Sequence, residues 1–250
     1  MNILITGCAG FIGFYLSEFL SKKYKKSKII GFDNINNFYS PILKKMRIKE
    51  LKKNKNFYFK KIDLENKKKI ENIFKRNKIK TVIHLAAQAG VRDSLKMPNS
   101  YFKSNFIGFI NIVNASNKNK VKKFIFASSS SVYGDKKKFP LKENMNISPK
   151  NIYSATKKIN EDIANDLSKI SNMKMIGLRF FTVYGKFGRP DMFIFKFLHS
   201  LLNSKKFYLY NKGNHYRDLT YIEDINKILS KLINKTFKKH EVFNVCSNNP

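Results

Sequence analysis

Tyr153 and Lys157 are the two residues whose types and spacing most directly suggest chemistry. They lie four positions apart in a segment, 152–170, that is predicted to be helical, so their side chains share one helix face. A tyrosine, with a reference pKa of about 10, acts as a base at neutral pH only if a cation stabilises its phenolate. Lys157 is placed to be that cation. A pair with this spacing also occurs as an ordinary surface contact, so the neighbouring segments must decide between the two interpretations.

A glycine-rich loop near the N-terminus predicts a dinucleotide site. Gly7, Gly10 and Gly13 stand three apart, directly after an apolar strand and before a helix. Such a loop turns tightly and presents backbone amides to a pyrophosphate at the helix N-terminus. Phe11 and Ile12 belong to the same loop and are included among the cofactor-binding residues. A glycine triplet alone can also serve helix packing, but the order of strand, loop and helix favours the binding role.

Acidic and small residues follow the next strands. Asp33 ends the second strand, twenty residues after the last loop glycine. A carboxylate there accepts ribose hydroxyls and repels a 2′-phosphate, so NAD is favoured over NADP. Asp63 and Leu64 end the third strand, where they are suited to an adenine ring, although an acid that caps the strand end is an equal explanation. Ala86 and Ala87 open a small-residue loop that lets a ligand approach the backbone.

Strands alternate with helices along residues 1–180, which predicts a parallel sheet with helices on both faces. We therefore expect a doubly wound, Rossmann-type α/β sheet that binds NAD, with helices at 66–77, 98–119 and 152–170. The serines at 128–131 end a strand at the sheet edge where such folds bind ligands. Residues 181–250 are expected to form a smaller, partial substrate-binding portion, with a helix at 191–203, a strand at 206–210, a helix from 222 and a strand at 241–247.

Composition sets limits on the class of protein. The two cysteines, Cys8 and Cys246, lie near opposite ends of the 250-residue chain and suggest neither a disulfide framework nor a metal site. The histidines, at positions 84, 199, 215 and 240, have no ligand spacing, so they are interpreted as structural and no metal is expected. We see no leader segment and no apolar run long enough to cross a bilayer, so a cytoplasmic protein without membrane insertion is expected.

The net charge of +33 raises the possibility of a nucleic-acid partner. The excess is lysine, spread over every predicted surface, whereas arginine occurs only at positions 47, 76, 92, 179, 189 and 217. Dedicated nucleic-acid readers concentrate arginine and aromatic residues on one face. We therefore expect weak, salt-sensitive binding to polyanions and no specific nucleic-acid partner.

Seven motifs together resemble the extended short-chain dehydrogenase/reductases that act on nucleotide-sugars. They are, in chain order, TGCAGFIG, Asp33, HLAAQAGVRDS, ASSSSVYG, YSATK, RFFTVYG and YRDLTYIEDI. The resemblance implies a catalytic triad of Ser129, Tyr153 and Lys157. In such a triad Ser129 hydrogen-bonds the sugar hydroxyl that Tyr153 deprotonates, and Lys157 also holds the nicotinamide ribose.

The loop at the end of the fifth strand helps to decide which reaction this resemblance implies. Ser130 and Ser131 stand where dehydratases of the family carry Asp and Glu, and sugar-acid decarboxylases carry a glutamate in place of Ser131. Elimination of water needs an acid and a base at neighbouring carbons. Epimerisation needs only reversible oxidation at C4 and rotation of the ketone, so an epimerase is favoured.

The segments NNFYSPILK, AQAGVRDSLKMP and GRPDMF resemble UDP-glucuronate 4-epimerases. In that resemblance Thr182 and Arg189 lie near the sugar carboxylate, and the serines at 130 and 131 add hydroxyl donors. A charge-assisted contact to the carboxylate is needed, because the 4-keto sugar acid loses CO₂ when its carboxylate is free to rotate. The alternative is that Arg189 is a helix-entry arginine paired with Asp191. Arg92 and Arg217 match positions near the diphosphate, or are ordinary surface residues.

Two departures leave several hypotheses open. Asp93 stands where the family usually has tyrosine, and the chain ends where relatives continue for some tens of residues, so the substrate-binding portion is expected to be truncated. The first hypothesis is an active 4-epimerase of UDP-glucuronate, with UDP-glucose or another nucleotide-sugar as the runner-up substrate and a dehydratase as another possible activity. The second is an NAD-binding protein without turnover, and the third is a basic polyanion-binding protein. Relatives commonly pair through two long helices, so a homodimer through 98–119 and 152–170 is expected.

Overall fold

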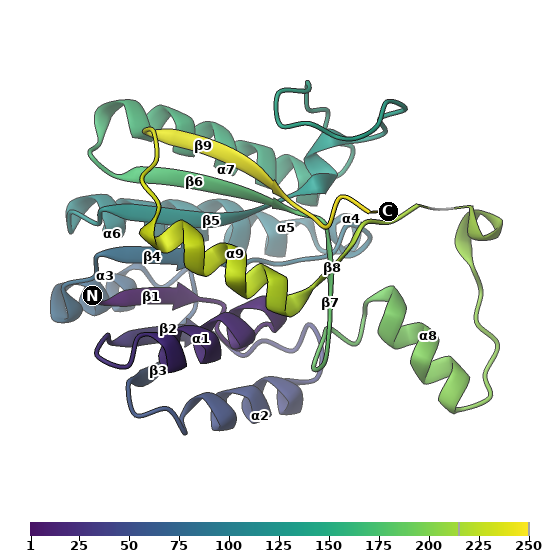
Figure 1. The fold of residues 1–250 in the computed structure, drawn as a ribbon, viewed down its shortest axis with the longest axis horizontal. Coiled ribbons are helices and arrows are strands. Elements are labelled where there is room, and N and C mark those ends of the chain that lie inside the picture. Colours follow the sequence, from purple (N-terminus) through teal and green to yellow (C-terminus); the bar gives the residue numbers. More distant parts are fainter. Residues whose placement is uncertain (215, 250) are drawn as a thin grey trace.

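Parallel strands form the central seven-stranded sheet of the computed structural model, which describes residues 1–214 and 216–249 (Figure 1). The strand order is β3-β2-β1-β4-β5-β6-β9. The strands are β1 Ile3–Thr6, β2 Ile29–Asp33, β3 Phe57–Lys61, β4 Thr81–His84, β5 Lys123–Ser129, β6 Lys174–Phe180 and β9 His240–Val245. The predicted Rossmann-type sheet is confirmed. Its strand order reverses between β1 and β4, which places a ligand site at the carboxyl ends of these strands.

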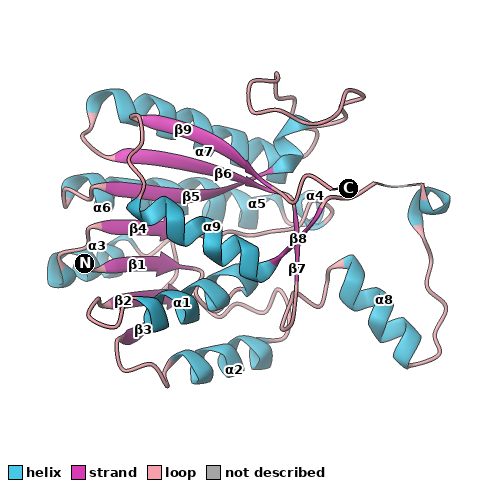
Figure 2. Ribbon diagram, viewed as in Figure 1, coloured by secondary structure: helices cyan, strands magenta, loops and turns pink. Residues whose placement is uncertain are grey.

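Helices cover both faces of the sheet because alternate strand residues point to opposite sides. In β1, Ile3 and Ile5 pack into one core and Leu4 into the other. Figure 2 shows the two helical layers, which are α1 Phe11–Lys23, α2 Pro41–Leu51 and α9 Ile222–Asn234 on the first face, and α3 Lys67–Asn77, α6 Gly108–Lys118 and α7 Ile152–Ile170 on the second. In the described part of the chain, no helix is both long and apolar enough to span a bilayer.

The helix predicted at 98–119 forms as consecutive pieces. After the short α4 Asp93–Lys96 come α5 Pro98–Tyr101, the π-helical stretch η1 Phe102–Ile107, and α6. A π-helical stretch is a local widening that is frequent at functional sites. It carries Asn105, whose Nδ2 donates to Gln88 O (3.0 Å) and Thr156 Oγ1 (3.1 Å), while its Oδ1 accepts from Gln88 N (2.7 Å). This side chain therefore fastens the loop after β4 to α7.

Residues after the expected boundary at 180 contribute to both the sheet and its carboxyl edge. β7 Thr182–Tyr184 pairs with β8 Leu219–Tyr221 in a two-stranded parallel sheet, while β9 pairs with β6 and α9 packs on α1. The short η2 Ser130–Tyr133 follows β5 directly. α8 Phe193–Leu202 and η3 Tyr210–Gly213 lie beyond the carboxyl ends of the strands, away from the sheet (Figure 1).

The prediction of a strand at 206–210 is wrong, because the segment has no strand partner among the described residues. Phe207 instead packs edge-on against Phe193 and Phe197 of α8, with ring centroids 5.5 and 5.4 Å away. The alternation of apolar and polar residues is therefore satisfied by contact with a helix rather than by a sheet.

A buried ion pair ties α7 to the sheet. Arg179 of β6 donates from Nε to Glu161 Oε1 (3.0 Å) and from Nη2 to Oε2 (2.8 Å), and the two side chains are only 5% and 6% exposed. Ser128 Oγ donates to Glu161 at 2.5 Å, and Tyr133 accepts from Arg179 Nη1 at 2.8 Å. Tyr133 in turn donates to Asn244 of β9 (2.7 Å). One network thus joins β5, β6, β9 and α7.

We expect Arg179→Met to lower the free energy of unfolding by about 3–5 kcal/mol, because it leaves the buried carboxylate of Glu161 without its partner. The double variant Arg179→Met/Glu161→Gln should recover part of the loss, since it also removes the unpaired charge. Urea denaturation at neutral pH measures both. A single-variant loss below about 1 kcal/mol would show that the pair is not structural.

Candidate active site

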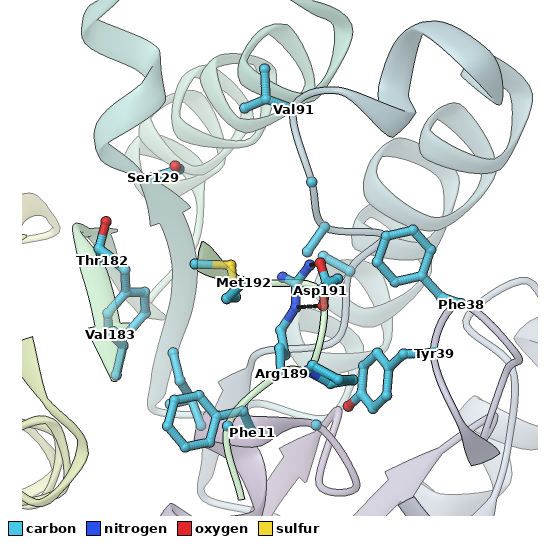
Figure 3. Close-up of a pocket in the computed structure, with 18 of the residues that line it drawn as sticks. Phe11, Phe38, Tyr39, Val91, Ser129, Thr182, Val183, Arg189, Asp191 and Met192 are labelled. Carbon is cyan, nitrogen blue, oxygen red and sulfur yellow. Dashed lines mark hydrogen bonds and ion pairs between the residues drawn. The ribbon is translucent and has the colours of Figure 1, made fainter. Parts of the chain in front are cut away.

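The carboxyl ends of the strands open into a cavity of about 1560 Å³ (Figure 3). This exceeds the roughly 300–1,000 Å³ of a site for one drug-sized ligand. Of the residues predicted from sequence, those that line it are Gly7, Gly10, Phe11, Ile12, Gly13, Asp33, Leu64, Ala86, Ala87, Arg92, Ser129, Ser130, Ser131, Tyr153, Lys157, Thr182, Arg189 and Arg217. Segments far apart in the chain therefore meet around one space.

The glycine loop leaves no room for side chains at its centre. Gly7 has φ of +72°, and a Cβ on Gly13 would lie 2.1 Å from Gly7 O. A Cβ on Gly7 would lie 2.7 Å from Ala86 N, in the loop after β4. The loop leads into α1, whose first turn carries no acidic side chain and whose N-cap, Gly10, makes no side-chain cap. The amides of the first turn of α1, which have no partner within the helix, and the positive helix end fit the pyrophosphate of a dinucleotide.

Asp33, the last residue of β2, lines the same cavity. Its Oδ2 accepts from Ala9 N (3.2 Å) and its Oδ1 from Ile35 N (2.8 Å). Burial raises the pKa of this carboxyl, while the two hydrogen bonds and the charges of Lys44 and Arg47 oppose the shift. An acid fixed in this position fits the ribose of NAD, as the sequence predicts.

Asp63 does not line the cavity, unlike its neighbour Leu64. Its Oδ2 accepts from Asn34 Nδ2 (2.8 Å) and its Oδ1 from Glu65 N (2.9 Å). The structure thus gives it the local capping role that the sequence left as an alternative. Leu64 and Ile62 provide an apolar surface at this place.

Thr6 and His84 support the loop after β4 from behind, and sequence reasoning assigned Thr6 no role. Thr6 Oγ1 lies 2.8 Å from His84 Nδ1 and accepts from Ala86 N at 3.1 Å. Burial lowers the pKa of His84 to about 3, so the ring is neutral at physiological pH. His84 therefore has a structural role. Its position at the end of a buried strand is the feature of the sequence that indicates this role.

Tyr153 and Lys157 point into the cavity from the first turns of α7. Burial raises the pKa of Tyr153, whereas a hydrogen bond from Ser129 and the charge of Arg189 lower it. Lys157 Nζ lies 5.8 Å from the Tyr153 ring centroid and donates to Ala127 O at 2.8 Å. Burial lowers the pKa of Lys157 to about 8, opposed by the carboxylate of Glu161. Ser129, Tyr153 and Lys157 thus lie together, as the resemblance implies.

Hydroxyl groups gather where β5 turns into η2. Ser129 Oγ accepts from Ser131 N (3.2 Å) and from Ser131 Oγ (2.9 Å), which leaves its own proton for Tyr153. Ser130 and Thr182 line the cavity on the same side. No carboxylic acid stands at these positions.

Arg189 lies across the cavity from Ser129 (Figure 3). It donates from Nε and Nη2 to the two oxygens of Asp191, at 3.1 and 2.5 Å, and its guanidinium lies 5.7 Å from the Phe38 ring centroid. The pairing with Asp191 considered from sequence is therefore present. Asp191 binds the edge of the guanidinium formed by Nε and Nη2, and Nη1 lies on another edge.

The remaining predicted residues differ in how far the structure describes them. Arg92 and Arg217 line the cavity, and Arg217 Nη1 donates to Tyr216 O at 3.2 Å. His215 lies outside the described residues. Within the described residues no group of three His, Cys, Asp or Glu side chains could hold a metal ion.

Ser129, Tyr153 and Lys157 line the same cavity as the glycine loop, so a hydrogen-bonding hydroxyl, a phenol and a buried amine stand together beside a cradle that fits a dinucleotide. This juxtaposition defines an NAD-dependent enzyme of the short-chain dehydrogenase/reductase class.

Comparison with known proteins gives the family. The model of the NAD dependent epimerase/dehydratase family matches residues 3–246. An uncharacterized protein of Methanocaldococcus jannaschii is 44% identical over 250 residues, which are 100% of this chain and 76% of the relative. The UDP-glucuronate 4-epimerase of Thermodesulfobacterium geofontis is 41% identical over 223 residues, 89% of this chain and 68% of the relative.

Among solved structures, the chain is similar to UDP-glucuronic acid 4-epimerase from Bacillus cereus in complex with UDP-glucuronic acid and NAD. The TM-score is 0.92 at 31% identity, covering 98% of this chain and 77% of that chain. The chain therefore belongs to the NAD dependent epimerase/dehydratase family, and it is an NAD-dependent nucleotide-sugar epimerase of the extended short-chain dehydrogenase/reductase type.

The buried charge of Lys157 is expected to lower the free energy of unfolding. Its folded pKa of about 8 lies below the ordinary 10.5, so below pH 8 the buried ammonium destabilises the fold. As the pH rises from about 8 toward 10.5 the folded state loses its proton first, so the unfolded state binds more protons and stability increases. We expect Lys157→Met to raise the free energy of unfolding at pH 7 by on the order of 1–3 kcal/mol.

This gain should shrink between pH 8 and 10.5, while activity falls by about 10²–10⁴-fold at every pH. Urea denaturation of both proteins at several pH values measures the difference. A gain that does not change with pH would contradict the lowered pKa of Lys157 in the folded state.

Proposed function

We propose that this enzyme interconverts UDP-glucuronate and UDP-galacturonate by epimerisation at C4. The observation that carries the proposal is Arg189, which lies in the catalytic cavity close enough for its charge to lower the pKa of Tyr153. A guanidinium in that position is suited to the C5 carboxylate of a sugar acid. The solved and curated 4-epimerases of UDP-glucuronate that the chain resembles support the same substrate.

The chemistry asks little of the protein beyond proton transfer and positioning. When bound, NAD takes up the hydride from C4 and returns it to the opposite face of the resulting ketone. Tyr153, as phenolate, accepts the proton of the C4 hydroxyl, and Ser129 holds the same oxygen by a hydrogen bond. Lys157 holds the nicotinamide ribose and favours the phenolate. After the 4-keto sugar has rotated in the cavity to present its opposite face, Tyr153 returns the proton to the C4 oxygen.

Serine side chains at the end of β5 favour epimerisation over elimination. Ser130 and Ser131 supply hydroxyl donors and no acid–base pair for removing water. The 4-keto intermediate of a sugar acid is a β-keto acid. It loses CO₂ when the bond from C5 to the carboxylate lies perpendicular to the plane of the C4 carbonyl. A carboxylate held by Arg189 and Thr182 is kept from that orientation.

UDP-glucose is the second candidate substrate, and one observation favours it. Asp191 already neutralises part of the charge on Arg189, as a site for a neutral C6 hydroxyl would require. The two substrates use the same chemistry and differ only in what faces Arg189. A protein that binds NAD without turnover is the alternative of another class.

We expect the NAD-loaded enzyme to convert UDP-glucuronate to UDP-galacturonate, followed by NMR of the sugar anomeric signals. Tyr153→Phe removes the proton acceptor and should lower the rate by about 10²–10⁴-fold. NAD retained on the purified protein without conversion of any UDP-sugar would instead support the non-catalytic alternative.

Arg189→Ala should lower kcat/KM for UDP-glucuronate by about 10- to 100-fold, because it removes a charge-assisted hydrogen bond. The value for UDP-glucose should change by less than about threefold, since that sugar has no carboxylate. Arg76→Ala, at an exposed position of α3, is the matched control. Equal losses for both sugars would contradict the acid-sugar assignment.

We also propose a homodimer through the faces of η1 and α7, which pack side by side. Exposed apolar residues occur on these elements and on the preceding α4 and the residue after it, namely Leu95, Met97, Phe102, Ile107 and Ile159. Phe102→Glu should convert the dimer to a monomer in sedimentation experiments, because a charge would be buried at the interface. Ile42→Glu, at an exposed apolar site on α2, should not. A wild-type monomer at micromolar concentration would refute the proposal.

A further inference from the structure

Arg47 is a charged side chain buried without a carboxylate partner. It comes from α2 and is 1% exposed, and within the described part of the chain no acid lies at ion-pair distance from it. Its Nε also lacks a hydrogen-bond partner there. Burying a guanidinium is costly unless specific contacts compensate. The contacts it does make therefore indicate what it is for.

Those contacts join two segments that are far apart in the chain. Nη1 donates to Ala9 O in the glycine loop at 2.8 Å. Nη2 donates to Gly188 O at 3.3 Å and, more closely, to Phe187 O. Gly188 directly precedes Arg189, so one guanidinium links the loop that cradles the dinucleotide to the base of the proposed carboxylate-binding side chain.

Neighbouring aromatic residues contact both arginines. Nη1 of Arg47 also donates to the hydroxyl of Tyr39 at 2.7 Å, and its guanidinium lies 5.6 Å from that ring centroid. The adjacent Phe38 lies 5.7 Å from the guanidinium of Arg189. Figure 3 shows Phe38, Tyr39 and Arg189 along one wall of the cavity. The segment before α2 thus holds two arginines in a fixed relation.

The 187–188 segment has little freedom to find another position. Phe187 adopts φ of +50°, and a Cβ on Gly188 would lie 2.3 Å from the Phe195 ring. Phe187 also packs against Phe14 of α1, with ring centroids 6.2 Å apart. Arg47 adds the polar contacts to this arrangement, so its removal would free the carbonyls of Ala9, Phe187 and Gly188 and weaken the hold on the backbone that precedes Arg189.

We propose that Arg47 is a positioning residue that couples the dinucleotide loop to Arg189 and so sets the preference for an acidic sugar. The proposal rests on the proposed function, because it takes Arg189 as the group that meets the substrate carboxylate. Arg47 itself touches neither the sugar nor the reacting atoms. Its effect on selectivity must then pass through Arg189.

A double-mutant cycle tests this route. We compare kcat/KM for UDP-glucuronate with kcat/KM for UDP-glucose in the wild type, Arg47→Met, Arg189→Ala and the double variant, all loaded with NAD. Arg47→Met should lower the acid-to-neutral ratio by about 5- to 100-fold, the usual range for coupling between sites. In the Arg189→Ala background the same change should leave the ratio unaltered. Arg76→Met, an exposed arginine on α3, is the control and should not alter it.

An unchanged ratio in Arg47→Met, or an equal drop in both backgrounds, would overturn the proposal. If Arg47→Met does not fold, Tyr39→Phe takes its place, since it removes one acceptor of Arg47 and should lower the ratio in the same direction by a smaller factor. Equilibrium binding of NAD gives a second readout. Arg47→Met should weaken NAD binding through Ala9, whereas Arg189→Ala should not.

The failure of the proposed function has a different signature. If the wild type converts UDP-glucose but not UDP-glucuronate, the substrate assignment is wrong whatever Arg47 does. The coupling is then measured as the ratio of the dissociation constants of the two UDP-sugars on NAD-loaded protein, together with the NAD affinity. A variant that shifts neither quantity would overturn the role of Arg47 independently of the substrate.

Discussion

Buried positive charge around one cavity is the constraint on which this structure depends. Lys44, Arg47 and Lys157 are 5%, 1% and 4% exposed, and the side chain of Arg189 is 20% exposed. Removal from water lowers the pKa of both lysines, which shows that the folded chain holds these charges at a cost. Asp33 and Asp191 offset them only in part. An anionic dinucleotide that binds among the cavity-lining Lys44, Lys157 and Arg189 would offset part of this cost.

The sheet places these charges at fixed distances. The strands of the main sheet that lead into the site end at the same edge, because parallel pairing aligns the carboxyl ends of β1, β2, β4 and β5. Glu161 and Arg179 join the far half of the sheet to α7, the helix that carries Tyr153 and Lys157. The catalytic groups are thus mounted on rigid elements, whereas Arg189 reaches the cavity from a segment outside the main sheet. Arg47 anchors that segment to the sheet edge, so it can affect the position of Arg189 although it does not touch the reacting atoms.

Local signals allowed most of the fold and the cofactor cradle to be predicted from sequence. The glycine spacing, the acid that ends β2 and the bounds of α7 each depend on a few neighbouring residues, and the structure shows all three. The strand at 206–210 failed because its alternating pattern is satisfied by Phe193 and Phe197 of α8, a contact that no local pattern reveals. Arg47 was missed for the same reason, since its partners lie 38 and about 140 residues away. Asp63 follows β3, where its side chain accepts a hydrogen bond from Asn34, and its role toward an adenine ring stays a prediction.

Arginine is scarce in this chain, and most of its arginines lie where they donate several hydrogen bonds or line the cavity. Of six arginines in a sequence with a net charge of +33, Arg76 lies exposed on α3. Arg179 and Arg47 each donate several hydrogen bonds at once within the protein, while Arg189, Arg92 and Arg217 line the cavity. Lysine, a point charge on a flexible stem, covers the surface, and the planar guanidinium stands where several acceptors must be held in one geometry. The guanidinium groups of Arg47, Arg179 and Arg189 therefore bind carbonyls and carboxylates within the protein, whereas the exposed Arg92 and Arg217 line the same cavity as Arg189.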